Sequence, residues 1–171
     1  MIIKLENVRL SFPALFKAKA GPDGGEPKFG ASFLLDKTKH AAKIKEIEAA
    51  IEKLHREELK GKHMKGTCLH DGSEKPDTDG YGPGIKYVSA SSKKRIPIVD
   101  RDPSVALAEE DGKPYAGCYV NASIRLWAQD NQFGKRVNAE LRAVQFAKDG
   151  ESFGAAPVDA EAEFATLTDE L

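Results

Sequence analysis

A stretch of strict alternation constrains the fold of this chain more than any other feature. From position 118 to 128 every even-numbered residue is apolar: Cys118, Val120, Ala122, Ile124, Leu126 and Ala128. A period of two residues is typical of a β-strand with one buried face, because successive side chains point to opposite sides. The pattern predicts a long strand whose outward face carries Tyr119, Arg125 and Trp127.

A second strand follows closely enough to form a hairpin with the first. Residues 130–134 predict the turn, in which Gly134 can take a positive φ. Beyond it the apolar positions are 137, 139, 141 and 143, and then 144 and 146. This change of register predicts a β-bulge in the return strand. The hairpin is expected to span residues 115–148.

The rest of the chain predicts further short strands and one helix. Alternation indicates strands at 3–12, 29–35, 85–92 and about 96–99. In the first strand we expect a bulge near Asn7, a core position for Phe12 and an end at Pro13. Apolar residues at three- and four-residue steps predict a helix over 38–57, capped by Asp36 or Thr38. Turn-forming residues predict a long irregular loop at 60–84. Together these elements favour a mainly β fold, a small antiparallel barrel with one main helix.

Charge is divided unevenly along the chain, although the formal net charge is only −1. Residues 149–171 hold seven of the 27 acidic side chains and no Lys or Arg, which leaves a charge of +6 on residues 1–148. We expect a folded domain over residues 1–150 and a flexible, disordered acidic tail over residues 151–171. A basic body with such a tail suits binding of a polyanion that the tail regulates; the alternative is a tail that only adds solubility.

Several functional classes find no support in the sequence. No apolar run approaching 20 residues is present, and two cysteines are too few for a disulfide framework. From the first residues, which are typical of a strand, we expect no signal peptide. His63, Cys68 and His70 lie close together but lack the spacing of a zinc site. P-loop, GxSxG and GxGxxG motifs are absent. We therefore expect a cytoplasmic protein with no catalytic residues, no metal and no cofactor.

Aromatic and cationic side chains are interleaved on the outward face of the hairpin and near it. Single-stranded nucleic acid suits such a surface, because each base stacks on an aromatic ring for about 1–3 kcal/mol while Lys and Arg follow the phosphates. The alternatives are that the loop at 60–84 covers Trp127 and that the cations at 93–95 form a solvated edge. The residues expected to contact DNA are Tyr81, Tyr87, Lys93, Lys94, Arg95, Arg101, Tyr119, Arg125, Trp127, Phe133, Lys135 and Arg136.

Three long segments resemble one phage protein family: residues 8–16 (VRLSFPALF), 115–122 (YAGCYVNA) and 127–138 (WAQDNQFGKRVN). The similarity continues at 144–146 and 150–154. The family was formerly a domain of unknown function and is described as phage single-stranded DNA-binding proteins. The resemblance implies an OB-fold-like barrel that coats single-stranded DNA during phage replication or recombination, with an acidic C-terminal tail.

The resemblance and the residue pattern lead to the same expectation, a non-enzymatic and sequence-independent single-stranded DNA-binding protein in the cytoplasm of a bacterial host. We expect its tail to bind replication or recombination proteins through Asp159, Glu161, Glu163, Phe164, Leu167, Asp169, Glu170 and Leu171. Two alternatives stay open. One is a structural or assembly protein of a phage particle that self-associates as a homo-oligomer, and the other is an enzyme that uses the loop carboxylates.

Overall fold

The alternating stretch near the C-terminal end forms one arm of a long hairpin, as predicted. Strand β7 (Tyr119–Asn131) pairs antiparallel with β8 (Gly134–Lys148). Gly134 takes a φ of +106° at the turn. The pairing shifts at Arg142, an extra residue on β8, which confirms the predicted bulge. The structure is a computed structural model that describes residues 1–21, 24–154 and 160–167.

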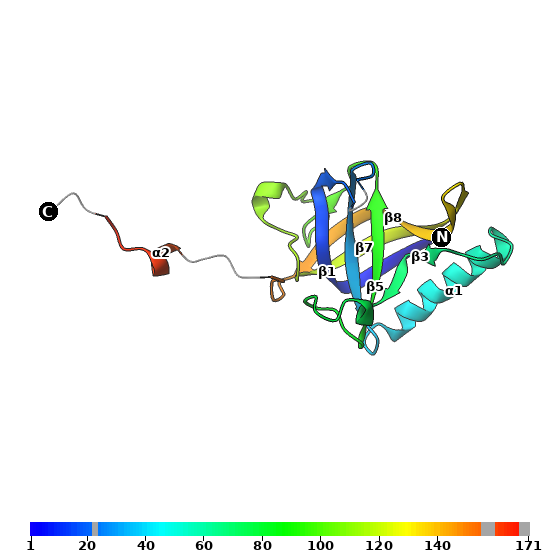
Figure 1. Ribbon diagram of the computed structural model, residues 1–171. Coiled ribbons are helices and arrows are strands. Elements are labelled where there is room, and N and C mark those ends of the chain that lie inside the picture. The colour runs from blue at the N-terminus through cyan, green and yellow to red at the C-terminus, as the bar shows by residue number, and fades with distance from the viewer. Residues whose placement is uncertain (22–23, 155–159, 168–171) are drawn as a thin grey trace.

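Five strands close into a barrel (Figure 1). Strand β1 (Ile2–Lys19) pairs antiparallel with β7 on one side and with β2 (Lys28–Asp36) on the other, and β2 pairs antiparallel with β5 (Ile85–Ser92). The circle closes where Ser91 of β5 pairs in parallel with Glu140 of β8. The expected mainly β barrel is thereby confirmed.

Three shorter strands extend the barrel wall. Strands β3 (Gly66–Thr67) and β6 (Ile98–Val99) pair with β8, while β4 (Leu69–Asp71) pairs with β5. A short 3₁₀ helix, η1 (Gly72–Glu74), follows β4, and a second, η2, covers Glu109–Asp111. The prediction that residues 60–84 form one irregular loop is therefore wrong, because backbone pairing with the barrel orders part of this segment.

The first strand is longer than predicted and contains two irregularities. Asn7 takes a φ of +53° where the pairing with β7 shifts, which confirms the predicted bulge. Pro13 does not end the strand, which continues to Lys19. Phe12 takes a φ of +46° at a second register shift and is 60% exposed, while Ser11 is buried. The prediction that Phe12 lies in the core is wrong, because the turn of the backbone moves its side chain outward.

Helix α1 (Ala41–Glu57) lies along one end of the barrel (Figure 1). Its residues Ile44, Ile47 and Ile51 join the apolar core. It begins three residues later than predicted. The Asp36 carboxylate accepts hydrogen bonds from the backbone N–H groups of residues 38 and 39, at 2.8 and 2.9 Å, and so holds the turn that precedes the helix. Among the described residues, no helix is both long and apolar enough to cross a membrane.

Residues 149–154 contact the barrel and form a C-terminal clasp. The guanidinium carbon of Arg9 lies 4.3 Å from the centroid of the Phe153 ring. The Tyr115 hydroxyl donates to Asp149 at 2.7 Å, and the Gly154 N–H donates to Asp79 at 2.9 Å. These contacts continue four residues beyond position 150, where the folded domain was expected to end.

The expected tail is described in part. Helix α2 (Ala160–Glu163) carries two of its carboxylates. Phe164 and Leu167 are 76% and 95% exposed. The other four residues expected to bind a partner lie outside the described residues: Asp159, Asp169, Glu170 and Leu171.

Candidate nucleic-acid interface

A groove of about 1220 Å³ crosses the surface where the barrel closes. Its walls come from the end of β5 and the residues after it, from the outward face of β7 and from β8. Strands β3 and β4 border it. Six of the residues expected to contact DNA line this single groove: Lys93, Lys94, Arg125, Trp127, Phe133 and Arg136.

Two aromatic rings open onto the groove. Trp127 lies on the outward face of β7, opposite Asn138 of β8, and is 36% exposed. It is therefore on the face that the alternation predicted, and the 60–84 segment does not bury it. Phe133 is 67% exposed at the hairpin tip. Exposed rings of this size have a hydrophobic cost in water, so a pair of them in one groove favours a stacking partner.

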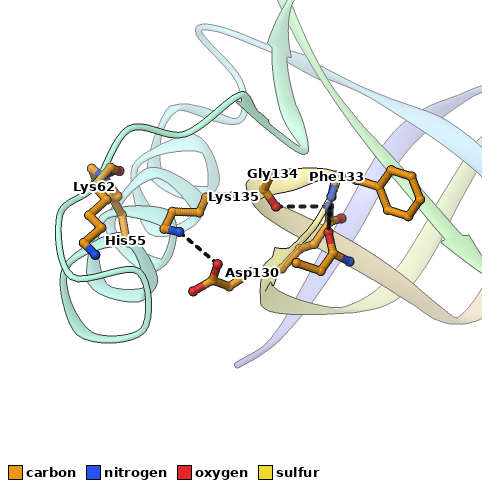
Figure 2. Close-up of polar contacts among 8 residues, drawn as sticks. His55, Lys62, Asp130, Phe133, Gly134 and Lys135 are labelled. Carbon is orange, nitrogen blue, oxygen red and sulfur yellow. Dashed lines mark hydrogen bonds and ion pairs between the residues drawn. The ribbon is translucent and has the colours of Figure 1, made fainter.

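The hairpin tip separates the Phe133 ring from a nearby ion pair. Figure 2 shows the ring projecting from one side of the tip, while Lys135 reaches Asp130 on the other. The ammonium of Lys135 lies 2.9 Å from a carboxylate oxygen of Asp130. Lys135 does not appear among the described residues that line the groove, and its charge is already balanced within the hairpin.

Six cations line the groove together with the two rings: Lys28, Lys93, Lys94, Arg125, Arg136 and Arg142. Arg125 lies 3.4 Å from a carboxylate oxygen of Glu140, and both side chains are partly exposed. Lys93 lies 3.8 Å from a carboxylate oxygen of Glu26, and the exposed Lys94 is its neighbour. Exposed pairs of this kind have weak net attraction because water screens them. The cations therefore remain accessible to a polyanion.

Three other predicted contacts lie elsewhere on the surface. Arg95 is placed over the ring of Phe29, with 5.2 Å from its guanidinium carbon to the ring centroid. Arg101 lies in the segment after β6. Tyr119 packs under the ammonium of Lys148, 4.7 Å from its ring centroid. None of the three is among the described residues lining the groove.

Tyr81 and Tyr87 belong to an aromatic cluster beside the groove. The ring of Tyr87 stacks on that of His70 at 4.9 Å between centroids and meets the edge of Tyr81 at 5.0 Å. Tyr87 is 5% exposed, and burial raises the pKa of its hydroxyl. Burial also lowers the pKa of His70, with nearby Glu74 acting in the opposite direction. Tyr87 thus supports its neighbours rather than presenting an open ring.

Sequence reasoning missed several polar residues of the groove. Asn138, for example, lies on β8 between the buried Val137 and Ala139. The alternation along this strand was available in the sequence and points the Asn138 side chain outward. The further lining residues include Lys28, His70, Gln129, Asn131 and Arg142, and the groove is also lined by the serines of β5, Ser89, Ser91 and Ser92.

The groove is chemically a binding surface. Cys68 lines it but is 5% exposed, and burial raises the pKa of its thiol to about 11, which keeps it protonated and a poor nucleophile. Within residues 1–21, 24–154 and 160–167, no group of three His, Cys, Asp or Glu side chains is arranged to hold a metal ion. Rings, hydroxyl groups and cations along one open channel suit an extended, negatively charged ligand with flat faces.

Sequence comparison relates the chain to a phage family. The profile described as Enterobacter phage Enc34, ssDNA-binding protein matches residues 1–171. A putative protein p50 of Acyrthosiphon pisum secondary endosymbiont phage 1 is 40% identical over 179 residues, which cover 98% of this chain and 95% of that protein.

Solved structures share the fold. The single-stranded DNA-binding protein from bacteriophage Enc34 in complex with ssDNA has a TM-score of 0.81 at 35% identity, over 90% of this chain and 89% of that one. The single-stranded DNA-binding protein gp2.5 of bacteriophage T7 has a TM-score of 0.61 at 12% identity, over 100% and 98% of the two chains. The second similarity concerns the fold alone. The OB-fold-like barrel expected from the resemblance is confirmed.

Proposed function

The chain belongs to the family of the Enterobacter phage Enc34 single-stranded DNA-binding protein, and from this we propose that it binds single-stranded DNA without sequence preference. Its role is to coat and protect single strands during phage replication or recombination in the cytoplasm of the bacterial host. The relative solved in complex with ssDNA supports the binding role. No catalytic step is assigned to this chain.

One observation carries the proposal. Trp127 and Phe133 open onto the same groove as Lys93, Lys94 and Arg136, although these residues come from two separate parts of the chain, the β7–β8 hairpin and the segment after β5. A base can stack on each ring, and every base has a flat face, so stacking does not depend on sequence. The cations neutralise phosphates and release counterions, which makes the affinity depend strongly on salt.

Selectivity for single strands follows from the same arrangement. In a duplex each base is stacked between its neighbours and paired across the helix, so its face cannot reach a ring without unstacking. A single strand can turn its bases toward Trp127 and Phe133 at much lower cost. The serines on β5 are small enough for the sugar–phosphate chain to approach and can donate hydrogen bonds to phosphate oxygens.

The acidic tail is assigned a regulatory role in this proposal. Its carboxylates are attracted to the cations of the groove at the high effective concentration of a tethered segment, so they compete with DNA. Once DNA displaces the tail, Phe164 and Leu167 become available to a replication or recombination partner. The exposure of both side chains is compatible with this role.

Titration with oligo-dT tests the function. Stacking on the only tryptophan of the chain should quench its fluorescence, and the affinity should fall steeply with salt and exceed that for a duplex of equal length. A gel mobility assay provides an independent measure of binding. No quenching and no mobility shift at low salt would favour the structural or assembly alternative. Metal-dependent loss of the oligonucleotide would favour an enzyme.

A further inference from the structure

Phe12 combines a strained backbone with an exposed apolar ring, and neither feature stabilises the folded protein. It takes a φ of +46°, which is strained for any residue with a side chain, and its ring is 60% exposed. The residues before it, Leu10 and Ser11, are both buried, so the backbone turn is what brings the ring outside. Strain of this kind persists where a site requires a particular arrangement.

The Phe12 ring does not stand alone on this surface. Tyr81 lies 6.2 Å from it between centroids, with the two ring planes tilted by 45°. The ammonium of Lys75 lies 5.2 Å from the centroid of Phe12 and 5.7 Å from that of Tyr81. The Tyr81 hydroxyl donates to Ser11 at 3.0 Å, which fixes the orientation of this ring. We call Phe12, Tyr81 and Lys75 the Phe12 patch.

The Phe12 patch is continuous with the groove. His70 lines the groove and stacks on Tyr87, which in turn meets Tyr81. Tyr87 lies two residues before Ser89, a groove residue, on the same face of β5. Two residues of a strand span roughly 7 Å, close to the spacing between nucleotides in an extended strand. Ser89 also contacts Ser32 on the neighbouring strand β2, at 3.2 Å between hydroxyl oxygens.

We propose that the Phe12 patch is a second base-stacking site, at the opposite end of the DNA path from Trp127 and Phe133. This inference rests on the proposed function. A base stacks on the exposed face of Phe12 beside Tyr81, and Lys75 contacts the adjoining phosphate. The serines between the two sites carry the backbone across β2 and β5. One molecule therefore holds a strand at two separated aromatic sites.

Replacement of Phe12 by glycine separates this role from a structural one. Glycine adopts a positive φ without strain, so Phe12→Gly should raise the urea midpoint of unfolding. The same variant should bind a long labelled oligo-dT about 5- to 150-fold more weakly, as expected for one lost stacking contact. Phe12→Trp keeps a ring and should retain tight binding. Val105→Ala, which removes an exposed apolar side chain far from both sites in the chain, is the matched control and should change neither quantity.

A tryptophan probe reports on the site directly. In the double variant Phe12→Trp, Trp127→Phe, the only tryptophan is at position 12, and oligo-dT should quench it. Anisotropy of a labelled oligonucleotide measures binding at the same time. The second site is overturned if Phe12→Gly binds oligo-dT as tightly as the wild type and if the tryptophan at position 12 is not quenched in the bound double variant. The proposed function stands in that case, provided that the wild-type protein binds oligo-dT. If wild-type protein fails to bind oligo-dT, both fall.

Discussion

Leu126 and Trp127 are adjacent on β7 and lie on opposite faces of the barrel wall, with 1% and 36% of their surfaces exposed. Leu126 belongs to the apolar core, and Trp127 opens onto the groove. Two neighbouring residues of similar hydrophobic character therefore have separable roles. The pair provides an internal comparison between a change in folding and a change in binding.

Trp127→Ala is expected to weaken binding to oligo-dT by about 1–3 kcal/mol, because one stacked base is lost. The fold should survive, since the ring is partly exposed. Leu126→Ala should instead lower the free energy of unfolding by about 2–5 kcal/mol, because it leaves a cavity in the core. Urea unfolding and oligonucleotide titration of both variants measure the two effects. Unfolding of Trp127→Ala, with unchanged affinity of the folded fraction, would make Trp127 a core residue.

Neutralising a groove cation should weaken binding to all sequences alike. Lys94→Gln and Arg136→Gln are each expected to reduce the slope of log affinity against log salt by roughly 0.7, the value for one phosphate contact on a single strand. Lys45→Gln, on the exposed face of α1, is the control and should leave the slope unchanged. Lys135→Gln should have a smaller effect than Lys94→Gln, because Lys135 is paired with Asp130. Equal effects would show that DNA takes Lys135 out of this pair.

Two truncations separate the C-terminal clasp from the tail. Removal of residues 155–171 deletes five carboxylates and should tighten binding to oligo-dT at low salt, with a difference that shrinks as salt rises. Thermal stability should hardly change. Removal of residues 149–171 also deletes Phe153 and Asp149, so the melting temperature should fall because the contacts with Arg9 and Tyr115 are lost. Equal affinity of the shorter truncation and the full chain at low salt would exclude competition by the tail.

Stability should decrease in mild acid because of His70. Its pKa in the folded protein is below the ordinary value of 6.5, chiefly because of burial, so the unfolded chain takes up a proton that the folded protein does not. The contribution is fully present above about pH 6.5 and is lost as pH falls toward the lower folded value. Urea midpoints at pH 7.5 and 5.5 measure it. His70→Gln should lose less stability between these two values, and an identical loss would assign the effect to other groups.

Local alternation predicted the hairpin, both bulges and the outward position of Trp127, because a half-buried strand leaves a period of two in the sequence. Phe12 shows the limit of this reasoning. Its place in the alternation indicates a core residue, but the positive φ of Phe12 turns the side chain outward. No neighbouring glycine in the sequence indicates a positive φ at this position. The closure of β5 on β8 could not be predicted from the sequence either, because it joins residues 49 positions apart through a single pair, Ser91 with Glu140.

The sequence predicted only part of the candidate site, because contacts between distant parts of the chain decide which residues line it. Sequence reasoning can count cations and rings, but their partners come from distant parts of the chain. The guanidinium of Arg95 lies over the ring of Phe29, and the ring of Tyr87 stacks on that of His70 from another strand. Which cations line the groove depends on the packing of the fold rather than on residue type, and two of them, Lys93 and Arg125, form exposed ion pairs with Glu26 and Glu140.

Barrel closure also affects the tendency of the protein to aggregate at high concentration. The proposed role of coating single-stranded DNA requires a high protein concentration, at which unpaired strand edges promote aggregation. Each of the five barrel strands is paired on both sides for at least part of its length. Within the described ranges, the strands added at the periphery are only two or three residues long. Such short edges are poor templates for intermolecular sheets, so the same closure that shapes the groove also disfavours aggregation at high protein concentration.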